Sequence, residues 1–248
     1  MSHLHFPDGV LPIWLWVLGY VITFFLLYLF LHKLEMKKNF GRLPLLGLFS
    51  AVMFLGMSFE LVPIAYHINL SVVAGIILGP ALGFLAVFIV NTFSAFLGHG
   101  GITVIGLNTL TVGFEVFVGY YLFRIVYSFI KRVALSTFLT TFITLFLSTL
   151  FTVGIVYLGT QNLGTLVHHA GRGFLSLELG QPKEGPFKNA PHVDFTRFLS
   201  ITLPLGFIGW ILESFISSAL LTYLAKEKPD ILPNRLGHKC HPEASRRI

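Results

Sequence analysis

The sequence predicts an all-α polytopic membrane protein of about seven transmembrane helices, with the N-terminus outside and the C-terminus in the cytoplasm. The 248 residues are 54% hydrophobic and only 11% charged, and the mean hydropathy is +0.79. Apolar runs of the roughly 20 residues needed to cross the hydrocarbon core recur along the chain. Lys and Arg gather between alternate runs, as expected for cytoplasmic connections.

The first predicted span, Val10 to Leu31, ends at a basic cluster. This cluster consists of Lys33, Lys37, Lys38 and Arg42. The positive-inside rule places it in the cytoplasm, so the N-terminus is expected outside. The second span, Leu43 to Tyr66, leads back out, so His67 is expected on the same face as His5.

Residues 68–97 are too long for one span. At about 1.5 Å per residue, a single helix here would be about 45 Å long, against a core of roughly 30 Å. Gly79-Pro80 lies inside this run, and proline interrupts helical hydrogen bonding. We therefore predict a short descending helix, Leu70 to Leu78, and an ascending one, Ala81 to Leu97.

The second half of the chain continues the alternation. Gly101 to Ile130 is expected to descend, Val133 to Leu158 to ascend, and residues 159–197 to form a long external loop. Phe198 to Ala225 then descends to a basic cytoplasmic tail, residues 226–248. We expect residues 1–225 to form a single transmembrane domain.

Charge placement agrees with this order. Thirteen of the 17 Lys and Arg residues are cytoplasmic: four in the first loop, three around the second and six in the tail. The net charge of +6 therefore reflects topology in a lipid bilayer rather than a nucleic-acid partner.

Histidines concentrate on the predicted outer face. Of the ten, seven are expected there: His3, His5, His67, His99, His168, His169 and His192. Neutral imidazole is a preferred ligand of late first-row metals. A cluster from several loops would suit capture of Ni²⁺ or Co²⁺, although for any single histidine an interfacial position without a ligand role is the alternative.

The N-terminus offers further nitrogen ligands. A free amine, the next deprotonated amides and a histidine at position two or three form a square-planar set suited to Ni²⁺ or Cu²⁺. Met1-Ser2-His3 places a histidine third, or second if Met1 is removed.

Three glutamates lie inside predicted spans, where ionisable groups are costly. Glu60, Glu115 and Glu213 either form a proton or cation relay or hydrogen-bond to neighbouring helices, with Arg124 as one candidate partner. The structural role is the favoured interpretation.

Motifs for catalysis are missing from the sequence. Leu97 to Gly101 is a glycine-rich stretch that predicts a tight external turn with a flexible backbone. The sequence has no Walker motif, G-x-S-x-G, H-E-x-x-H or Cys-x-x-Cys. We therefore expect neither an enzyme nor a bound cofactor.

Several motifs resemble one known family. His5-Phe6-Pro7-Asp8-Gly9-Val10-Leu11 is similar to an M-H-I-P-D-G-F-L start, and Gly75-Ile76-Ile77-Leu78-Gly79-Pro80 to an L-L-G-P break. Leu97-Gly98-His99-Gly100-Gly101-Ile102, followed by Ile105-Gly106-Leu107-Asn108, resembles F-G-D-G-G and A-I-G-A-N. These are motifs of the CbiM/NikM family, the substrate-binding membrane components of cobalt and nickel energy-coupling-factor transporters.

The resemblance implies a metal-ligand set. It consists of an amine at the position of Leu4, the amide and side chain of His5, and the side chain of His67. This sequence departs from the family in starting before Leu4: either translation begins at Leu4, or the extension supplies its own chelate.

Three lower-ranked ligands follow from differences between this sequence and the family motifs. Ser2 and His3 would provide the chelate of the extension, and His99 stands where the family has Asp. Around the second histidine, Ala65-Tyr66-His67-Ile68-Asn69 replaces the family's Gly-Thr-Ser-Gly-like residues. These changes bear on which metal is bound.

The resemblance implies Ni²⁺ or Co²⁺ uptake by the membrane substrate-capture subunit of an ATP-driven transporter in a prokaryotic inner membrane. Residues 1–225 would be the substrate-binding domain. Its partners would be a transmembrane coupling subunit, cytoplasmic ATPase subunits and, optionally, a small accessory membrane subunit. The alternative is a stand-alone proton- or cation-coupled carrier or channel that uses the intramembrane glutamates.

Overall fold

The computed structural model describes residues 6, 8, 11–33, 40–58, 67–98, 100–169 and 195–228. The regular elements in these ranges are all helical: α1 (Ile13–Lys33), the 3-10 turn η1 (Phe40–Arg42), α3 (Leu43–Ser58), α4 (Ser71–Phe96), α5 (Ile105–Ile130), α6 (Val133–His169) and α7 (Phe195–Glu227). Five helices are long and apolar enough to cross a membrane, and α3 is a shorter apolar helix. The predicted all-α membrane fold is confirmed.

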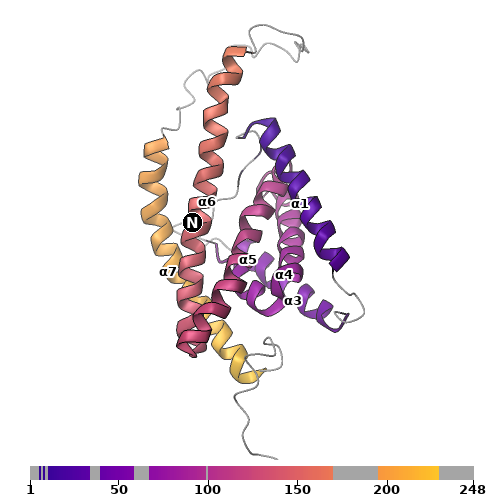
Figure 1. Cartoon of the computed structure of the whole chain (residues 1–248), viewed down its shortest axis with the longest axis vertical. Helices are drawn as coiled ribbons and strands as arrows, with labels where there is room; N and C mark the ends of the chain where they lie inside the picture. Colours follow the sequence, from indigo (N-terminus) through magenta and orange to yellow (C-terminus); the bar gives the residue numbers. More distant parts are fainter. Residues whose placement is uncertain are drawn as a thin grey trace, which may run out of the picture.

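The helices form two groups joined by α5. In Figure 1, α6 and α7 run side by side, and α5 packs against α6 on one side and against α1 and α4 on the other. The main buried apolar cluster lies in the group that contains α1, α3 and α4, where α3 packs against α4. Its members include Phe49, Met53, Val72, Ile76 and Val116.

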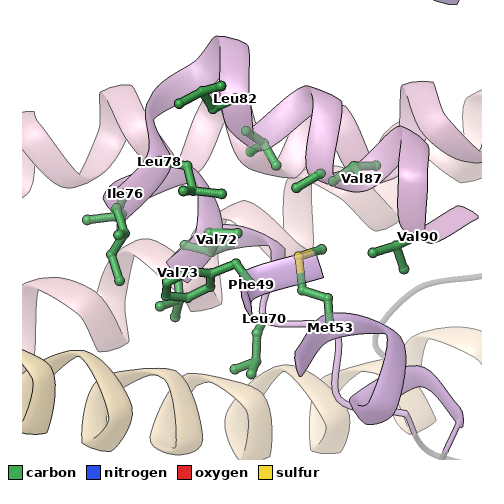
Figure 2. Packing of buried hydrophobic residues seen from close by; sticks show 14 of the residues in the cluster. Phe49, Met53, Leu70, Val72, Val73, Ile76, Leu78, Leu82, Val87 and Val90 are labelled. Atoms are coloured by element: carbon green, nitrogen blue, oxygen red, sulfur yellow. The ribbon is translucent and has the colours of Figure 1, made fainter. Parts of the chain in front are cut away.

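Helix α4 is a hairpin with two arms. Gly79, at φ 79° and ψ 172°, has a backbone conformation that is essentially restricted to glycine. A Cβ built on Gly83 would lie 3.4 Å from Cα of Gly75, whereas residues eight apart in a straight helix are separated by about 12 Å. The predicted break at Gly79-Pro80 is therefore confirmed, and Figure 2 shows Leu78 and Leu82 on either side of the bend.

The first arm of α4, residues 71–78, is buried at every position. Its C-terminal end is capped from η1, because Nη2 of Arg42 donates a hydrogen bond to the carbonyl of Ile77 at 2.8 Å. A cation in this place also interacts favourably with the helix dipole. The arm thus runs from the neighbourhood of His67 to the end of the molecule where Arg42 lies.

Several helix boundaries differ from the predicted ones. Helix α3 ends at Ser58, and residues 59–66 of the predicted second span lie outside the described residues. Helix α6 continues past Leu158 to His169, so the predicted loop 159–197 is helical at its start. The sequence there contains no proline to end the helix. With 37 residues, α6 is about 55 Å long, which exceeds the roughly 30 Å hydrocarbon core.

Candidate metal-binding site

The backbone of Phe6 is fixed to the first turn of α5. Its N–H donates to Oδ1 of Asn108 at 2.9 Å, and its carbonyl accepts a hydrogen bond from Nδ2 of Asn108 at 3.2 Å. The N–H of Gly101 donates to the same carbonyl at 3.0 Å. Phe6 and Asn108 are both buried, so the residue next to the predicted ligand His5 in the sequence is held from two sides.

Asp8 attaches the same part of the chain to the turn before α5. We call this part, represented by Phe6 and Asp8, the N-terminal segment. Its Oδ1 accepts hydrogen bonds from the N–H and the hydroxyl of Thr103 at 2.8 and 2.5 Å, and its Oδ2 accepts one from the N–H of Ile102 at 3.1 Å. These bonds, that from the Thr103 hydroxyl foremost, lower the pKa of Asp8 from its ordinary value.

The glycine-rich turn after α4 is confirmed, but its role differs from the predicted one. Gly98 and Gly100 have φ values of 81° and 92°, which favour glycine. Gly101 lies so close to Asp8 that an added Cβ would be 2.5 Å from the Asp8 nitrogen. The predicted flexible turn is therefore a docking surface for the N-terminal segment, made possible by the missing side chain.

Residues 67–71, which we call the His67 segment, lead into the first arm of α4. His67 is half-buried. Nδ2 of Asn69 donates to Oε2 of Glu115 at 3.2 Å, and the Ser71 hydroxyl donates to the same oxygen. The N–H of Leu70 donates to Oε1 of Glu213 at 3.2 Å.

The two docked segments share one face of α5. Asn108, which holds Phe6, and Glu115, which holds Asn69, are seven residues apart in this helix. Two helical turns return the chain to the same face, about 10 Å further along the axis. The structure thus brings the N-terminal segment and the His67 segment onto the same helix, as the predicted common site requires.

His67 is the one predicted ligand among the described residues. The other predicted ligands, Ser2, His3, Leu4, His5 and His99, lie outside them, as does Glu60. Within the part of the chain that the structure describes, no group of three or more His, Cys, Asp and Glu residues could hold a metal ion.

The two described intramembrane glutamates make hydrogen bonds to neighbouring elements. Glu115 and Glu213 are completely buried, and the Ser148 hydroxyl of α6 donates to Oε1 of Glu115 at 2.7 Å. Arg124, the suggested partner, instead donates to the hydroxyl of Tyr120 at 3.2 Å. Hydrogen bonds to neighbouring elements are what the structural interpretation expects of both acids.

Sequence reasoning missed the residues that position the segments. Asn69, Ser71 and Ser148 are small polar residues in apolar runs, and no local pattern marks them as partners of Glu115. Asp8 and Asn108 do stand in the motifs that carry the family resemblance, which was the available signal for their importance.

A family model described as the cobalt uptake substrate-specific transmembrane region, CbiM, matches residues 5–231. A protein of Archaeoglobus fulgidus named as a fused nickel transport protein, NikMN, is 25% identical over 243 residues, which cover 94% of this chain and 69% of that protein. The cobalt transport protein CbiM of Sorangium cellulosum is 25% identical over 252 residues, covering 98% of this chain and 100% of that protein.

The fold also has a counterpart among solved structures. A crystal structure of a transition metal transporter superposes with a TM-score of 0.67 at 23% sequence identity, covering 95% of this chain and 97% of the other. At this identity the likeness concerns the fold alone.

Proposed function

Because the chain belongs to the CbiM family of cobalt-uptake transmembrane proteins, we propose that it captures Ni²⁺ or Co²⁺ as the membrane substrate-binding subunit of an ATP-driven energy-coupling-factor transporter. Relatives named for nickel and for cobalt transport support a divalent transition metal as the substrate and leave both metals open. The five apolar spans make the chain a multi-pass membrane protein.

The docking of two segments on one face of α5 carries this proposal. Asn108 and Glu115 hold the two segments about 10 Å apart along the helix. His67 precedes Asn69 by two residues, and an extended chain spans at most about 3.3–3.6 Å per residue. This spacing supports a site that the imidazole of His67 shares with ligands supplied next to Phe6.

The proposed ligands are nitrogen atoms from both segments. They are the imidazoles of His67 and His5, the backbone nitrogen of His5 and an amine at the position of Leu4. A planar all-nitrogen set of this kind suits Ni²⁺. If the chain keeps its first residues, Ser2 and His3 supply the chelate instead, and His99 is a further candidate.

Energy for uptake would come from partner subunits. The sequence carries no nucleotide-binding motif, so ATP hydrolysis is assigned to cytoplasmic ATPase subunits, connected to this chain by a transmembrane coupling subunit. A small accessory membrane subunit is compatible with the same assembly.

Isothermal titration of the purified full chain with NiCl₂ and CoCl₂ tests the proposal. His67→Ala should abolish or strongly weaken binding. His32→Ala is the matched control, because His32 is exposed near the far end of α1 and stacks on Tyr28. Unchanged binding after His67→Ala, with the wild-type unfolding temperature, would overturn the proposal.

A second measurement separates this function from the stand-alone carrier that would use Glu115 and Glu213. Vesicles containing the chain alone should show no accumulation of ⁶³Ni²⁺, and co-reconstituted partner subunits with ATP should restore it. Accumulation by the chain alone would favour the carrier.

A further inference from the structure

We infer that Glu115 and Glu213 are positioning residues for the metal ion, because their buried carboxyl groups fix residues 69–71 and thereby present His67 to it. This inference rests on the proposed function of His67 as a ligand. Neither glutamate is assigned to coordinate the metal.

The evidence begins with the convergence of hydrogen bonds on three consecutive residues. Glu115 of α5 accepts from the side chains of Asn69 and Ser71, and Glu213 of α7 accepts from the N–H of Leu70. All five residues are buried, four of them completely. In such surroundings water cannot replace a lost partner, so these bonds hold the segment firmly.

The backbone of Leu70 shows that the segment is held in an otherwise unfavourable conformation. Its φ of 57° and ψ of 18° are left-handed, a region that residues with a branched, bulky side chain rarely occupy. Such conformations persist where the surroundings over-determine them, and they cluster at ligand-binding sites. Here the carboxyl group of Glu213 binds the N–H of this same residue.

The other side of the segment is fixed by α3. The carbonyl of Ile68 packs against Gly56, where an added Cβ would collide with it. Residues 68–71 therefore contact α3, α5 and α7, and Ser148 extends the contacts to α6 through Glu115. His67 is attached directly to this rigid stretch, so the orientation of its imidazole depends on the two carboxyl groups.

The size of the expected loss in Ni²⁺ affinity follows from what is known of metal sites in other proteins. Partners that orient a metal ligand typically contribute about 10- to 100-fold in metal affinity. Glu213→Ala and Glu115→Ala should therefore weaken Ni²⁺ binding about 10- to 100-fold and change the electronic absorption spectrum of the bound Ni²⁺. Glu227→Ala, at the exposed end of α7, is the matched control and should change neither.

Conservative variants distinguish positioning from charge. Glu213→Gln keeps an oxygen that can accept from the N–H of Leu70, so it should retain most of the affinity. Glu115→Gln should also retain most of the affinity. Oδ1 of Asn69 accepts no hydrogen bond within the described residues. If the Asn69 amide rotates, this oxygen accepts a hydrogen bond from the NH₂ group of the new glutamine.

A glycine at position 70 tests whether Glu213 acts by holding the backbone of Leu70. A purely structural role of Glu213 predicts a different effect on Ni²⁺ affinity. Glycine adopts positive φ without penalty, so Leu70→Gly should restore part of the affinity lost in Glu213→Ala. If Glu213 only stabilised the fold, removing the buried Leu70 side chain would lower the unfolding temperature further and restore no affinity.

Failure of this inference is distinguishable from failure of the proposed function. If the wild type binds neither metal, or His67→Ala binds normally, the proposed function fails first. If His67→Ala abolishes binding while both Glu→Ala variants keep the wild-type affinity and spectrum, the positioning role is wrong and the function stands.

A milder pair of variants keeps the test decisive if the Glu→Ala proteins do not fold. Ser148→Ala removes only the 2.7 Å bond to Glu115, whereas Ser218→Ala removes an exposed bond to the carbonyl of Ala134, also 2.7 Å long. Only Ser148→Ala should weaken Ni²⁺ binding. Equal affinities in the two variants would overturn the inference.

Discussion

Oδ1 of Asp8 accepts two hydrogen bonds from a single residue, Thr103, one from its N–H at 2.8 Å and one from its hydroxyl at 2.5 Å. The two residues are 95 positions apart in the sequence. This contact joins the segment before α1 to the segment before α5, and it places the chain's N-terminal region beside the helix that also carries Glu115.

The Asp8 contact should depend on pH in a defined window. The hydrogen bonds lower the pKa of Asp8 below its ordinary value of 3.8, so the stabilisation is fully present above that value. It is lost as the pH falls through the lower pKa of the folded protein. We expect hydrogen-exchange protection at Ile102 and Thr103, corrected for intrinsic rates, to be constant from pH 7 to 5 and to disappear below pH 3.8. Asp8→Asn should lower this protection between pH 7 and 5, where the wild-type contact is intact. A loss of wild-type protection within that range would show that a group other than Asp8 titrates.

Gly101→Ala should displace the N-terminal segment. The new Cβ would lie 2.5 Å from the nitrogen of Asp8 and 2.7 Å from its Cγ, so the segment must move away from α5. We expect Ni²⁺ affinity, measured by titration calorimetry, to fall about tenfold or more, as when a metal ligand loses its orienting contacts. Gly154→Ala on α6, where a Cβ meets nothing within 4 Å, should retain wild-type affinity.

Asn108→Ala should destabilise the protein before any metal is added. It leaves the N–H of the buried Phe6 without its acceptor and the Phe6 carbonyl with one donor fewer, which costs about 1–3 kcal/mol. Thermal unfolding in detergent measures the loss. Asn91→Ala removes only a long, 3.4 Å bond to Thr109 and should cost less; an equal loss would contradict the assigned role.

Gly79→Ala should destabilise the hairpin of α4 through the backbone alone. A Cβ at this position meets no atom within 4 Å, but φ is +79° and ψ is 172°, which costs a non-glycine residue about 1–3 kcal/mol. Gly47→Ala in α3 also meets nothing within 4 Å and should be neutral or stabilising, because alanine favours helix. Equal unfolding temperatures of the two variants would show that the bend does not require glycine.

The sequence was informative about features that depend on local composition. Hydropathy predicted the spans, and Pro80 predicted the bend in α4, because a proline affects the helix that contains it regardless of its surroundings. Helix ends were less predictable. The start of the expected loop at 159 has polar residues and glycines, yet α6 continues through it to His169.

The contacts that organise the candidate site could not be predicted from the sequence, and the reason is physical. The partners of Glu115 are Asn69 and Ser71 of the His67 segment and Ser148 of α6. The His67 segment and α6 supply them from places far from Glu115 and from each other along the chain. Only the packing of α4 and α6 against α5 brings them together. A glutamate in an apolar run indicates that a partner must exist, but the run itself does not say which residue it is.

The first arm of α4 has a consequence for how an ion could cross the bilayer. Eight consecutive buried residues, 71–78, lie between the His67 segment and the carbonyl bound by Arg42. If His67 binds the ion as proposed, the ion would meet tightly packed side chains along this arm of the described structure. Passage along this arm would require residues 71–78 to leave the neighbours that bury them, so in the proposed function release of the ion depends on a movement of α4.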